Sequence, residues 1–394
     1  MAKNTNLGAA KLGKNDEFYT QYADIEAEMN AYVEFNPDVF RGKTILCPCD
    51  DPEWSNFTKY FAQNFTRFGL KKLISTSYAK SAGSKQLTFF EESSPQYDAK
   101  KHETHGKLFT LTSDRDGDGR IDSNDLVFSG YLEGDGDFRS PEVTRLRDEA
   151  DFIITNPPFS LFREFLTWIV QGKRSFSIIG NVNAITYKDV FGFLKEGKLW
   201  LGDSIHSGDR KFNVPDDYPL EAAGCGIDPD GKRYIRVKGV RWYTNIDYKQ
   251  RHSPIVLETI ANSLKYNKKL IKKLKQDYGC ESYPHYDNYD AIEVPITEGI
   301  PSDYDGVMGV PITFLDRYCP DQFEILETTE RWSTLRKKRY SKDIFPNAND
   351  LNATWVIFTR AGELIKGYKR LLIRYRKEWI QSHSDLDWKK DLSQ

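Results

Sequence analysis

Four short apolar segments, separated by stretches with helical periodicity, most constrain how this chain can fold. They are Thr44–Cys47, Lys72–Ser75, Asp151–Thr155 and Phe176–Gly180. Each is rich in Ile, Leu or Phe and ends in polar or turn-forming residues, which is typical of strands buried on both faces. Because strands that alternate with helices form parallel sheets, the pattern predicts an α/β fold with an open, doubly wound sheet. Such sheets bind ligands at the carboxyl ends of their strands.

The helical segments expected between these strands include residues 54–65 and 161–170. Near residue 246 the alternation fades, and an amphipathic lysine-rich stretch over 263–276 begins a region of different character. We therefore predict one domain over residues 1–246 and a second region over 247–394. The chain has no apolar run long enough for a membrane span or a signal core, and its five cysteines are scattered. We expect a cytoplasmic protein with reduced thiols that does not associate with membranes.

The tetrapeptide Asn-Pro-Pro-Phe directly follows the third apolar segment. Pro157 and Pro158 lack a backbone N–H and cannot continue a central strand, so the chain must leave the sheet there as an extended loop. Asn156 offers a side-chain carbonyl, Pro157 offers a main-chain carbonyl, and Phe159 offers a flat apolar face. An amino group on a planar ring needs two such acceptors and an aromatic surface to stack on. These four residues are therefore the predicted catalytic set, and a simple proline turn is the structural alternative.

The first apolar segment ends in an acidic turn, Cys49-Asp50-Asp51-Pro52. Asp51 is suited to cap a helix that has Pro52 as its first residue. That arrangement would leave the Asp50 carboxylate at the tip of the strand, where it can hold a cationic group of a ligand. The alternative is that both acids only cap the helix.

In this context the Asn-Pro-Pro-Phe motif resembles that of amino-group methyltransferases that use S-adenosylmethionine, in the form typical of enzymes acting on adenine N6. Five further segments resemble one family, the EcoRI-type adenine-specific DNA modification methyltransferases. They are Asn15–Thr20, Cys49–Pro52, Gly136–Ser140, Trp242–Asn245 and Tyr304–Pro311. The resemblance covers most of the chain. It implies a Rossmann-like methyltransferase domain over residues 1–246 and a DNA target-recognition region over 247–394.

The resemblance also implies which residues bind S-adenosylmethionine. The candidates come from three segments and are Phe18, Tyr19, Thr20, Cys49, Asp50, Asp51 and Asp137. Asp50 would hold the methionine ammonium group, and Asp137 lies in a loop that can approach the cofactor adenine or the target base. Taken alone, Phe18 and Tyr19 would more often be core aromatics. The second strand ends in hydroxyl residues where many relatives carry an acid for the ribose, so the ribose contact is left unassigned.

An acidic loop between the second and third apolar segments matches the calcium-binding loop of EF-hands at its diagnostic positions. The candidate ligands are Asp114, Asp116, Asp118, the Arg120 carbonyl, Asp122 and Asp125. Two features differ from a full EF-hand: residues 108–111 read as a strand, and the last position is Asp where Glu reaches further. A calcium ion here would be structural, because methyl transfer from a sulfonium needs no metal.

The formal net charge of −2 conceals a sharp segregation of charge. Residues 281–330 hold twelve acids and one base, a balance of −11, whereas residues 331–377 hold thirteen bases and three acids, a balance of +10. Basic residues interleaved with aromatics are typical of phosphate contacts, and a solvated protein face is the alternative. The predicted DNA-binding residues are Arg336, Lys337, Lys338, Arg339, Lys369 and Arg370.

The sequence thus predicts a site-specific adenine N6-methyltransferase that flips its target base out of double-stranded DNA. It would serve a restriction–modification system, with a cognate restriction endonuclease as partner, or act as a solitary modification enzyme. One alternative is a related enzyme that methylates an RNA base or a protein glutamine. Another is an inactive methyltransferase fold retained as a DNA-binding regulator. The recognition sequence and the choice between monomer and dimer are not fixed by the residues.

Overall fold

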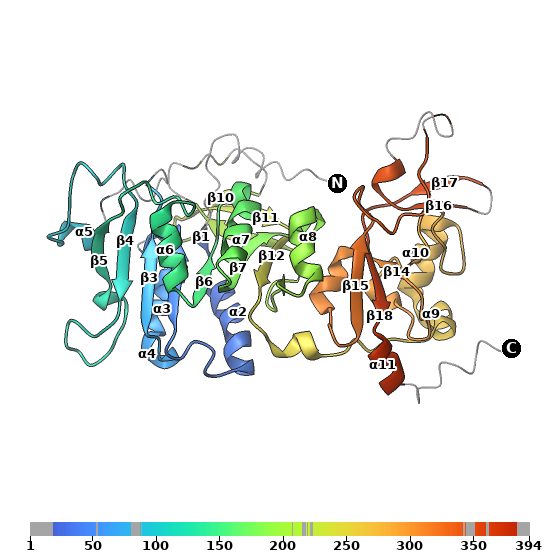
Figure 1. The fold of residues 1–394 in the computed structure, drawn as a ribbon, viewed down its shortest axis with the longest axis horizontal. Helices are drawn as coiled ribbons and strands as arrows, with labels where there is room; N and C mark the ends of the chain where they lie inside the picture. Colours follow the sequence, from blue (N-terminus) through green and yellow to red (C-terminus); the bar gives the residue numbers. More distant parts are fainter. Residues whose placement is uncertain are drawn as a thin grey trace. The chain divides into compact units, whose positions relative to one another are not determined.

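A computed structural model of the chain describes residues 19–383 apart from 53, 80–86, 88, 207, 215–217, 219, 221–223, 342, 344–350 and 360–361. The chain forms two compact units (Figure 1). The first unit holds the residues up to 184 together with 198–249, and the second holds 185–197 together with the residues from 250 onward. The segment 185–197 therefore belongs with the C-terminal part of the chain, which the pattern of the sequence does not indicate.

The first unit is built on an eight-stranded mixed sheet with the order β5-β4-β3-β2-β6-β7-β12-β8. The four predicted segments form its parallel centre, because β3 and β6 both pair in parallel with β2, and β7 pairs in parallel with β6. The outer strands are antiparallel. The strands are β2 (Thr44–Pro48), β3 (Lys72–Thr76), β4 (Lys107–Leu111), β5 (Val127–Tyr131), β6 (Phe152–Thr155), β7 (Ser175–Asn181), β8 (Trp200–Leu201) and β12 (Val240–Thr244). The predicted α/β class is confirmed.

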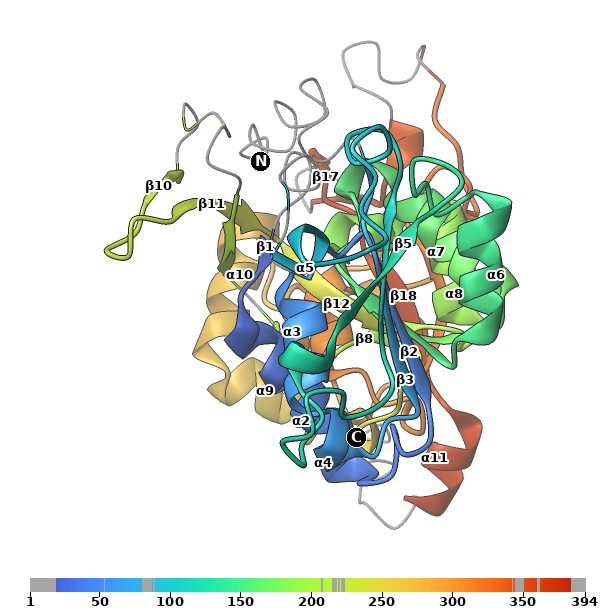
Figure 2. The same ribbon diagram turned by 90° about the vertical axis from the view of Figure 1, so that its left-hand side faces the viewer.

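Helices cover both faces of this sheet, with α2 and α3 on one side and α6 and α7 on the other (Figure 2). Their bounds, with two shorter helices, are α2 (Tyr22–Phe35), α3 (Asn56–Gln63), α4 (Phe65–Phe68), α5 (Phe89–Glu92), α6 (Pro141–Glu149) and α7 (Phe162–Gln171). In α7 the residues Phe165, Leu166 and Ile169 are buried, as their helical spacing predicts. Burying an Ile, Leu or Phe side chain contributes roughly 1.5–3 kcal/mol, so this face fixes the helix to the sheet.

A second sheet in the first unit has the order β1-β9-β11-β10 and is antiparallel throughout. Its strands are β1 (Tyr19–Thr20), β9 (Asp209–Asn213), β10 (Gly226–Ile227) and β11 (Arg233–Lys238). In Figure 2, β10 and the start of β11 extend away from the large sheet beside β1. The pairing of β1 with β9 joins Tyr19 to Asn213, a residue far along the chain.

The second unit contains a four-stranded sheet, a two-stranded sheet and four helices among its described residues. The larger sheet has the order β13-β14-β18-β15. Its strands and those of the smaller sheet are β13 (Ile292–Glu293), β14 (Met308–Val310), β15 (Phe323–Thr328), β18 (Leu371–Tyr375), β16 (Val356–Phe358) and β17 (Leu364–Lys366). The helices are α8 (Lys188–Lys195), α9 (Ile260–Tyr266), α10 (Lys268–Tyr278) and α11 (Lys377–Ser382). The predicted amphipathic stretch is divided at Asn267, whose side chain caps α10 by accepting a hydrogen bond from the Leu270 N–H. None of the helices described is long and apolar enough to cross a membrane.

The order of the parallel strands determines where a ligand can bind in the first unit. From β2 the chain proceeds to β3 on one side and later returns to β6 on the other side of β2. The connections that leave the carboxyl ends of β2 and β6 therefore turn to opposite faces of the sheet. Open α/β sheets bind ligands in the crevice that such a reversal creates.

Candidate active site at the carboxyl ends of the parallel strands

The Asn-Pro-Pro-Phe loop leaves the sheet at the end of β6, as the two prolines predict. Asn156 is half-buried, Pro157 is buried, and Phe159 opens a short 3-10 helix that leads into α7. The Phe159 ring meets the buried Phe212 ring of β9 edge to face, with 6.3 Å between centroids and an interplanar angle of 88°. This packing fixes the orientation of the one flat side chain in the predicted catalytic set.

The acidic turn after β2 is shaped by Cys49, which has a φ of 64°. A left-handed backbone costs a non-glycine residue about 1–2 kcal/mol, and such conformations cluster at functional sites. The turn is held to β3 because the Asp50 N–H donates to the Thr76 carbonyl at 2.7 Å. The expected helix start at Asp51 and Pro52 is wrong. The helix α3 begins at Asn56, and its cap is Ser55, whose hydroxyl accepts a hydrogen bond from the Phe57 N–H.

Asp50 lies buried at the tip of β2, with 5% of its surface exposed. The Ser55 hydroxyl donates to one carboxylate oxygen at 2.5 Å, and the Thr155 hydroxyl donates to the other. Burial raises the pKa of Asp50 to about 7, although these two hydrogen bonds act in the opposite direction. A nearby cation would favour the ionised form, so this carboxyl group is suited to receive a ligand ammonium.

Asp51 is also buried, and it belongs to a network that the sequence does not reveal. Its carboxylate lies 3.9 Å from the Lys107 ammonium, which in turn is 2.7 Å from the carboxylate of Glu91 in α5. Both Lys107 and Glu91 are fully buried. The Tyr131 hydroxyl donates to Glu91 at 2.9 Å. Two neighbouring carboxylates, Asp50 and Asp51, thus stand after the end of β2 in different electrostatic surroundings.

The last two residues of the predicted cofactor segment, Tyr19 and Thr20, lie beside the acidic turn. The Tyr19 ring stacks on Trp54, with 6.4 Å between centroids, and the Asn56 side-chain amide donates to the Thr20 carbonyl at 2.7 Å. Thr20 is paired with Phe212 across β1 and β9. The structure therefore brings Tyr19 and Thr20, the acidic turn and the Asn-Pro-Pro-Phe loop together. Phe18 lies outside the described residues.

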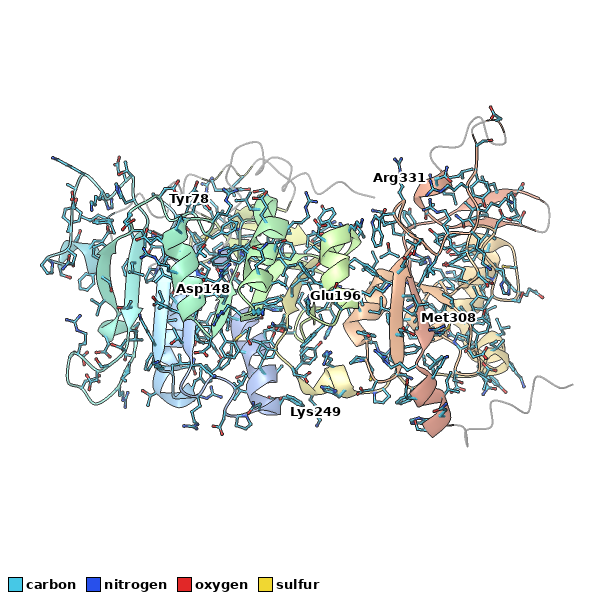
Figure 3. The ribbon with its side chains drawn as sticks, viewed as in Figure 1. Tyr78, Asp148, Glu196, Lys249, Met308 and Arg331 are labelled. Atoms are coloured by element: carbon cyan, nitrogen blue, oxygen red, sulfur yellow. The ribbon has the colours of Figure 1, made fainter. Side chains whose placement is uncertain are left out.

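The loop with Asp137 packs against the end of β3. Gly136 has a φ of 85°, and a Cβ atom there would lie 2.2 Å from the Ser77 carbonyl oxygen, so only glycine allows this approach. Tyr78, labelled in Figure 3, follows Ser77 at this edge. The Asp137 carboxylate accepts two hydrogen bonds from the Arg139 guanidinium, at 2.9 and 2.6 Å. Asp137 thus faces an arginine within its own loop.

The acidic loop at 114–125 assembles only part of its predicted calcium-binding set. Among the residues described, the carboxylate oxygens of Asp114, Asp116 and Asp118 lie within 4.8 Å of one another. Asp125 accepts hydrogen bonds from the backbone N–H groups of residues 115, 116 and 122 and closes the loop. The Asp125 carboxylate therefore stabilises the loop backbone, whereas the residue at this position of an EF-hand coordinates the calcium ion. The strand read at 108–111 is confirmed as part of β4.

The predicted DNA-binding residues of the second unit are largely paired with acids of the preceding stretch. Their ion-pair partners are Asp290 for Lys337, Asp287 for Lys338, Glu330 for Lys369 and Glu293 for Arg370. Arg336 is half-buried, and its guanidinium donates to the Glu330 carbonyl at 2.6 Å; Arg339 is exposed. Four of the six predicted DNA-binding residues therefore form ion pairs with acids of the 281–330 stretch.

Among the predicted DNA-binding residues, Arg370 has the surroundings least suited to contact with DNA. Its guanidinium donates to both carboxylate oxygens of Glu293, at 2.8–3.2 Å, and its side chain is 12% exposed. Glu293 is fully buried and also accepts a hydrogen bond from the Tyr278 hydroxyl at 2.9 Å. Arg370 thus neutralises a buried carboxylate, and a phosphate would have to compete with that bidentate pair.

Several residues at the site do not emerge from the sequence. Thr155 and Ser55 bind the Asp50 carboxylate, Trp54 stacks on Tyr19, and Phe212 orients Phe159. The sequence carries a usable signal for Thr155, a polar residue that ends a buried strand directly before the motif. It carries none for Phe212, because that packing depends on the pairing of β9 with β1.

Comparison with known proteins agrees with this geometry. The chain is 42% identical over 327 residues to the type II methyltransferase M.EcoRI of Escherichia coli, covering 83% of this chain and 90% of that protein. It is 32% identical to the type II methyltransferase M.MpnI of Mycoplasma pneumoniae, over 81% of this chain and 84% of that protein. It is also 32% identical to the type II methyltransferase M.MgeORF184P of Mycoplasma genitalium, over 82% and 86%. No solved structure matches the chain.

A family model described as adenine-specific methyltransferase EcoRI matches residues 6–376. The fold, the loop at the end of β6 and this match define an adenine-specific methyltransferase. The chain belongs to the EcoRI family of these enzymes.

Proposed function

We propose that this protein transfers a methyl group from S-adenosylmethionine to N6 of an adenine in double-stranded DNA. The observation that carries the proposal is the convergence of Tyr19, the acidic turn and the Asn-Pro-Pro-Phe loop where the strand order reverses. The three relatives carry the name type II methyltransferase, which supports a role in restriction–modification with a partner endonuclease. The first unit would be a Rossmann-like catalytic domain, and the second would recognise the DNA target.

The residues of the acidic turn and of the segment beside it have side chains that suit S-adenosylmethionine. The cofactor carries an ammonium group, and the carboxylates of Asp50 and Asp51 lie at the end of β2. The stacked rings of Tyr19 and Trp54 add an aromatic wall. In this proposal Asp50 holds the ammonium. When bound, the cofactor supplies an electrophilic methyl group.

The chain's own contribution to the reaction is to hold the target amine. The side-chain carbonyl of Asn156 and the main-chain carbonyl of Pro157 accept the two N–H bonds of the adenine amine. Phe159, oriented by Phe212, stacks on the flipped base. Accepting both hydrogens directs the nitrogen lone pair away from the acceptors and toward the methyl donor. Catalysis on this scheme comes chiefly from proximity and orientation.

The test is transfer of tritiated methyl groups to duplex DNA, followed by digestion to nucleosides. We expect N6-methyladenine from the wild-type protein and none above background from Asn156→Ala, which should still bind the cofactor in calorimetry. Asn36→Ala, at an exposed asparagine after α2, is the matched control and should keep full activity. Labelled RNA or protein in place of DNA, or full activity of Asn156→Ala, would overturn the proposal.

A further inference from the structure

The paired strands β9 and β11 have one apolar face and one charged face. Side chains that lie opposite each other in an antiparallel pair share a face, and successive residues alternate between faces. Phe212 lies opposite Ile235 on one face, and both are buried. Lys211 lies opposite Arg236 on the other face, where Lys238 follows two positions along β11. We call the face with Lys211, Arg236 and Lys238 the ribbon face.

We call the β9–β11 pair the ribbon. Its apolar face packs against the Asn-Pro-Pro-Phe loop, the catalytic loop. Phe212 is 1% exposed and packs against the Phe159 ring, and β9 also pairs with β1 beside the predicted cofactor segment. The ribbon therefore begins beside the catalytic loop, and its charged face is the one that this packing does not use. A ligand lying on the ribbon face would be held in a fixed register with Phe159.

The ribbon face combines cations with an aromatic ring. Tyr234 is on the same face, with the Lys211 ammonium 4.8 Å and the Arg236 guanidinium 5.8 Å from its ring centroid. Its hydroxyl lies over Gly226 of β10, where a Cβ atom would be only 2.8 Å away. Two carboxylates share this surface, since Asp209 is opposite Lys238 and Asp228 pairs with Lys211 at 2.7 Å. Arg236 and Lys238 are exposed.

We propose that the ribbon face binds the sugar–phosphate backbone of DNA next to the flipped adenine. This inference rests on the proposed function and deepens it, because it assigns substrate contacts to the catalytic unit itself. Cations held by strand pairing and by an aromatic ring can bind phosphates without being ordered on binding. The ribbon thus positions the duplex and carries no sequence preference.

The experiment compares the double variant Arg236→Gln/Lys238→Gln with the wild type in binding to a random-sequence duplex at several salt concentrations. Each neutralised phosphate contributes about 0.9 to the slope of log K against log salt, so the slope should fall by about 0.9 for each phosphate that the variant no longer neutralises. Calorimetry with S-adenosylmethionine checks that the variant remains folded. The double variant Lys100→Gln/Lys101→Gln, at exposed lysines of the same unit, is the control for net charge.

The ribbon proposal is overturned if the salt slope of the double variant equals that of the wild type, or if the lysine control lowers it equally. The single variant Arg236→Lys should retain most of the slope, since it keeps the charge. The two proposals fail in distinguishable ways. If the wild-type protein leaves duplex DNA unmethylated, the proposed function is wrong. If it methylates DNA but the double variant has the salt slope of the wild type, only the ribbon proposal is wrong.

Discussion

The Thr155 hydroxyl shares its proton between two acceptors, the buried carboxyl group of Asp50 and, at 2.7 Å, the Pro48 carbonyl. One side chain thereby joins the end of β6, immediately before Asn156, to the end of β2. The predicted cofactor turn and the predicted catalytic loop are held in register through this hydroxyl.

Thr155→Val should therefore damage both loops. Removing a hydroxyl that serves a buried carboxyl group costs about 1–3 kcal/mol, and we expect that loss in the free energy of unfolding by urea. The pKa of Asp50 should rise further, because the hydrogen bond that the variant removes lowers it. Thr155→Ser keeps the hydroxyl and should retain most of the stability. A valine variant as stable as the wild type would contradict this role.

Asp50 should make stability and cofactor binding respond to pH in opposite directions. Its pKa is about 7 in the folded protein against an ordinary value of 3.8, so the folded state binds more protons between these limits. Stability should then decrease as pH rises from about 4 to about 7, by an amount on the order of a few kcal/mol. Affinity for S-adenosylmethionine should increase over the same range, because the ionised carboxylate attracts the ammonium.

Asp50→Asn isolates this effect. The variant should be more stable relative to the wild type at pH 8 than at pH 5, and its cofactor affinity should no longer increase with pH through this carboxyl group. Urea unfolding and calorimetry at both pH values measure the two effects. Asp38→Asn, at an exposed acid after α2, serves as the control. An unchanged pH dependence in Asp50→Asn would show that another group is responsible.

Arg370 and Lys337 should differ in what their removal costs. Arg370→Met leaves the buried Glu293 carboxylate without its bidentate partner, and we expect a decrease of about 3–5 kcal/mol in the free energy of unfolding. Lys337→Met breaks a pair whose side chains are 63% and 79% exposed, and should cost less than about 1 kcal/mol. If Arg370→Met instead weakens DNA binding at unchanged stability, Arg370 binds phosphate as the sequence predicts.

Calcium binding at the acidic loop stays a prediction that calorimetry can decide. With three carboxylates converging in place of six ligands, we expect binding no tighter than that of extracellular calcium modules, about 10⁻⁴–10⁻³ M. The variant Asp114→Asn/Asp118→Asn should lose the heat of binding, while Asp98→Asn should keep it. If calcium produces no heat of binding with the wild type, the prediction of a calcium site in this loop is wrong.

The sequence predicts well those features that depend on neighbouring residues. The four buried strands and α7 follow from apolar runs and helical spacing, and the exit of the chain at Pro157 follows from proline chemistry alone. The cap of α3 is predicted at Asp51 but is Ser55. Asp and Ser are both favoured helix caps, so the local sequence does not decide between them.

What the sequence could not predict depends on pairing between distant segments. The packing of Phe212 on Phe159 requires β9 to pair with β1, and nothing local in either strand specifies that register. The charge pattern shows a similar limit. It separates acids from bases along the chain, but only the fold shows that Asp287 and Asp290 lie against Lys338 and Lys337. Composition therefore overestimates the basic surface available to DNA.

The place of α8 has a consequence for recombining such enzymes. This helix lies near the midpoint of the sequence and is followed by strands of the first unit, yet it belongs to the second unit, where Phe191 packs on Trp332 with 5.3 Å between ring centroids. Exchanging the C-terminal part between homologues at a single crossover would separate that helix from its packing partners. A functional chimera of this family needs two inserted segments, 185–197 and the chain after 249, taken from the same parent.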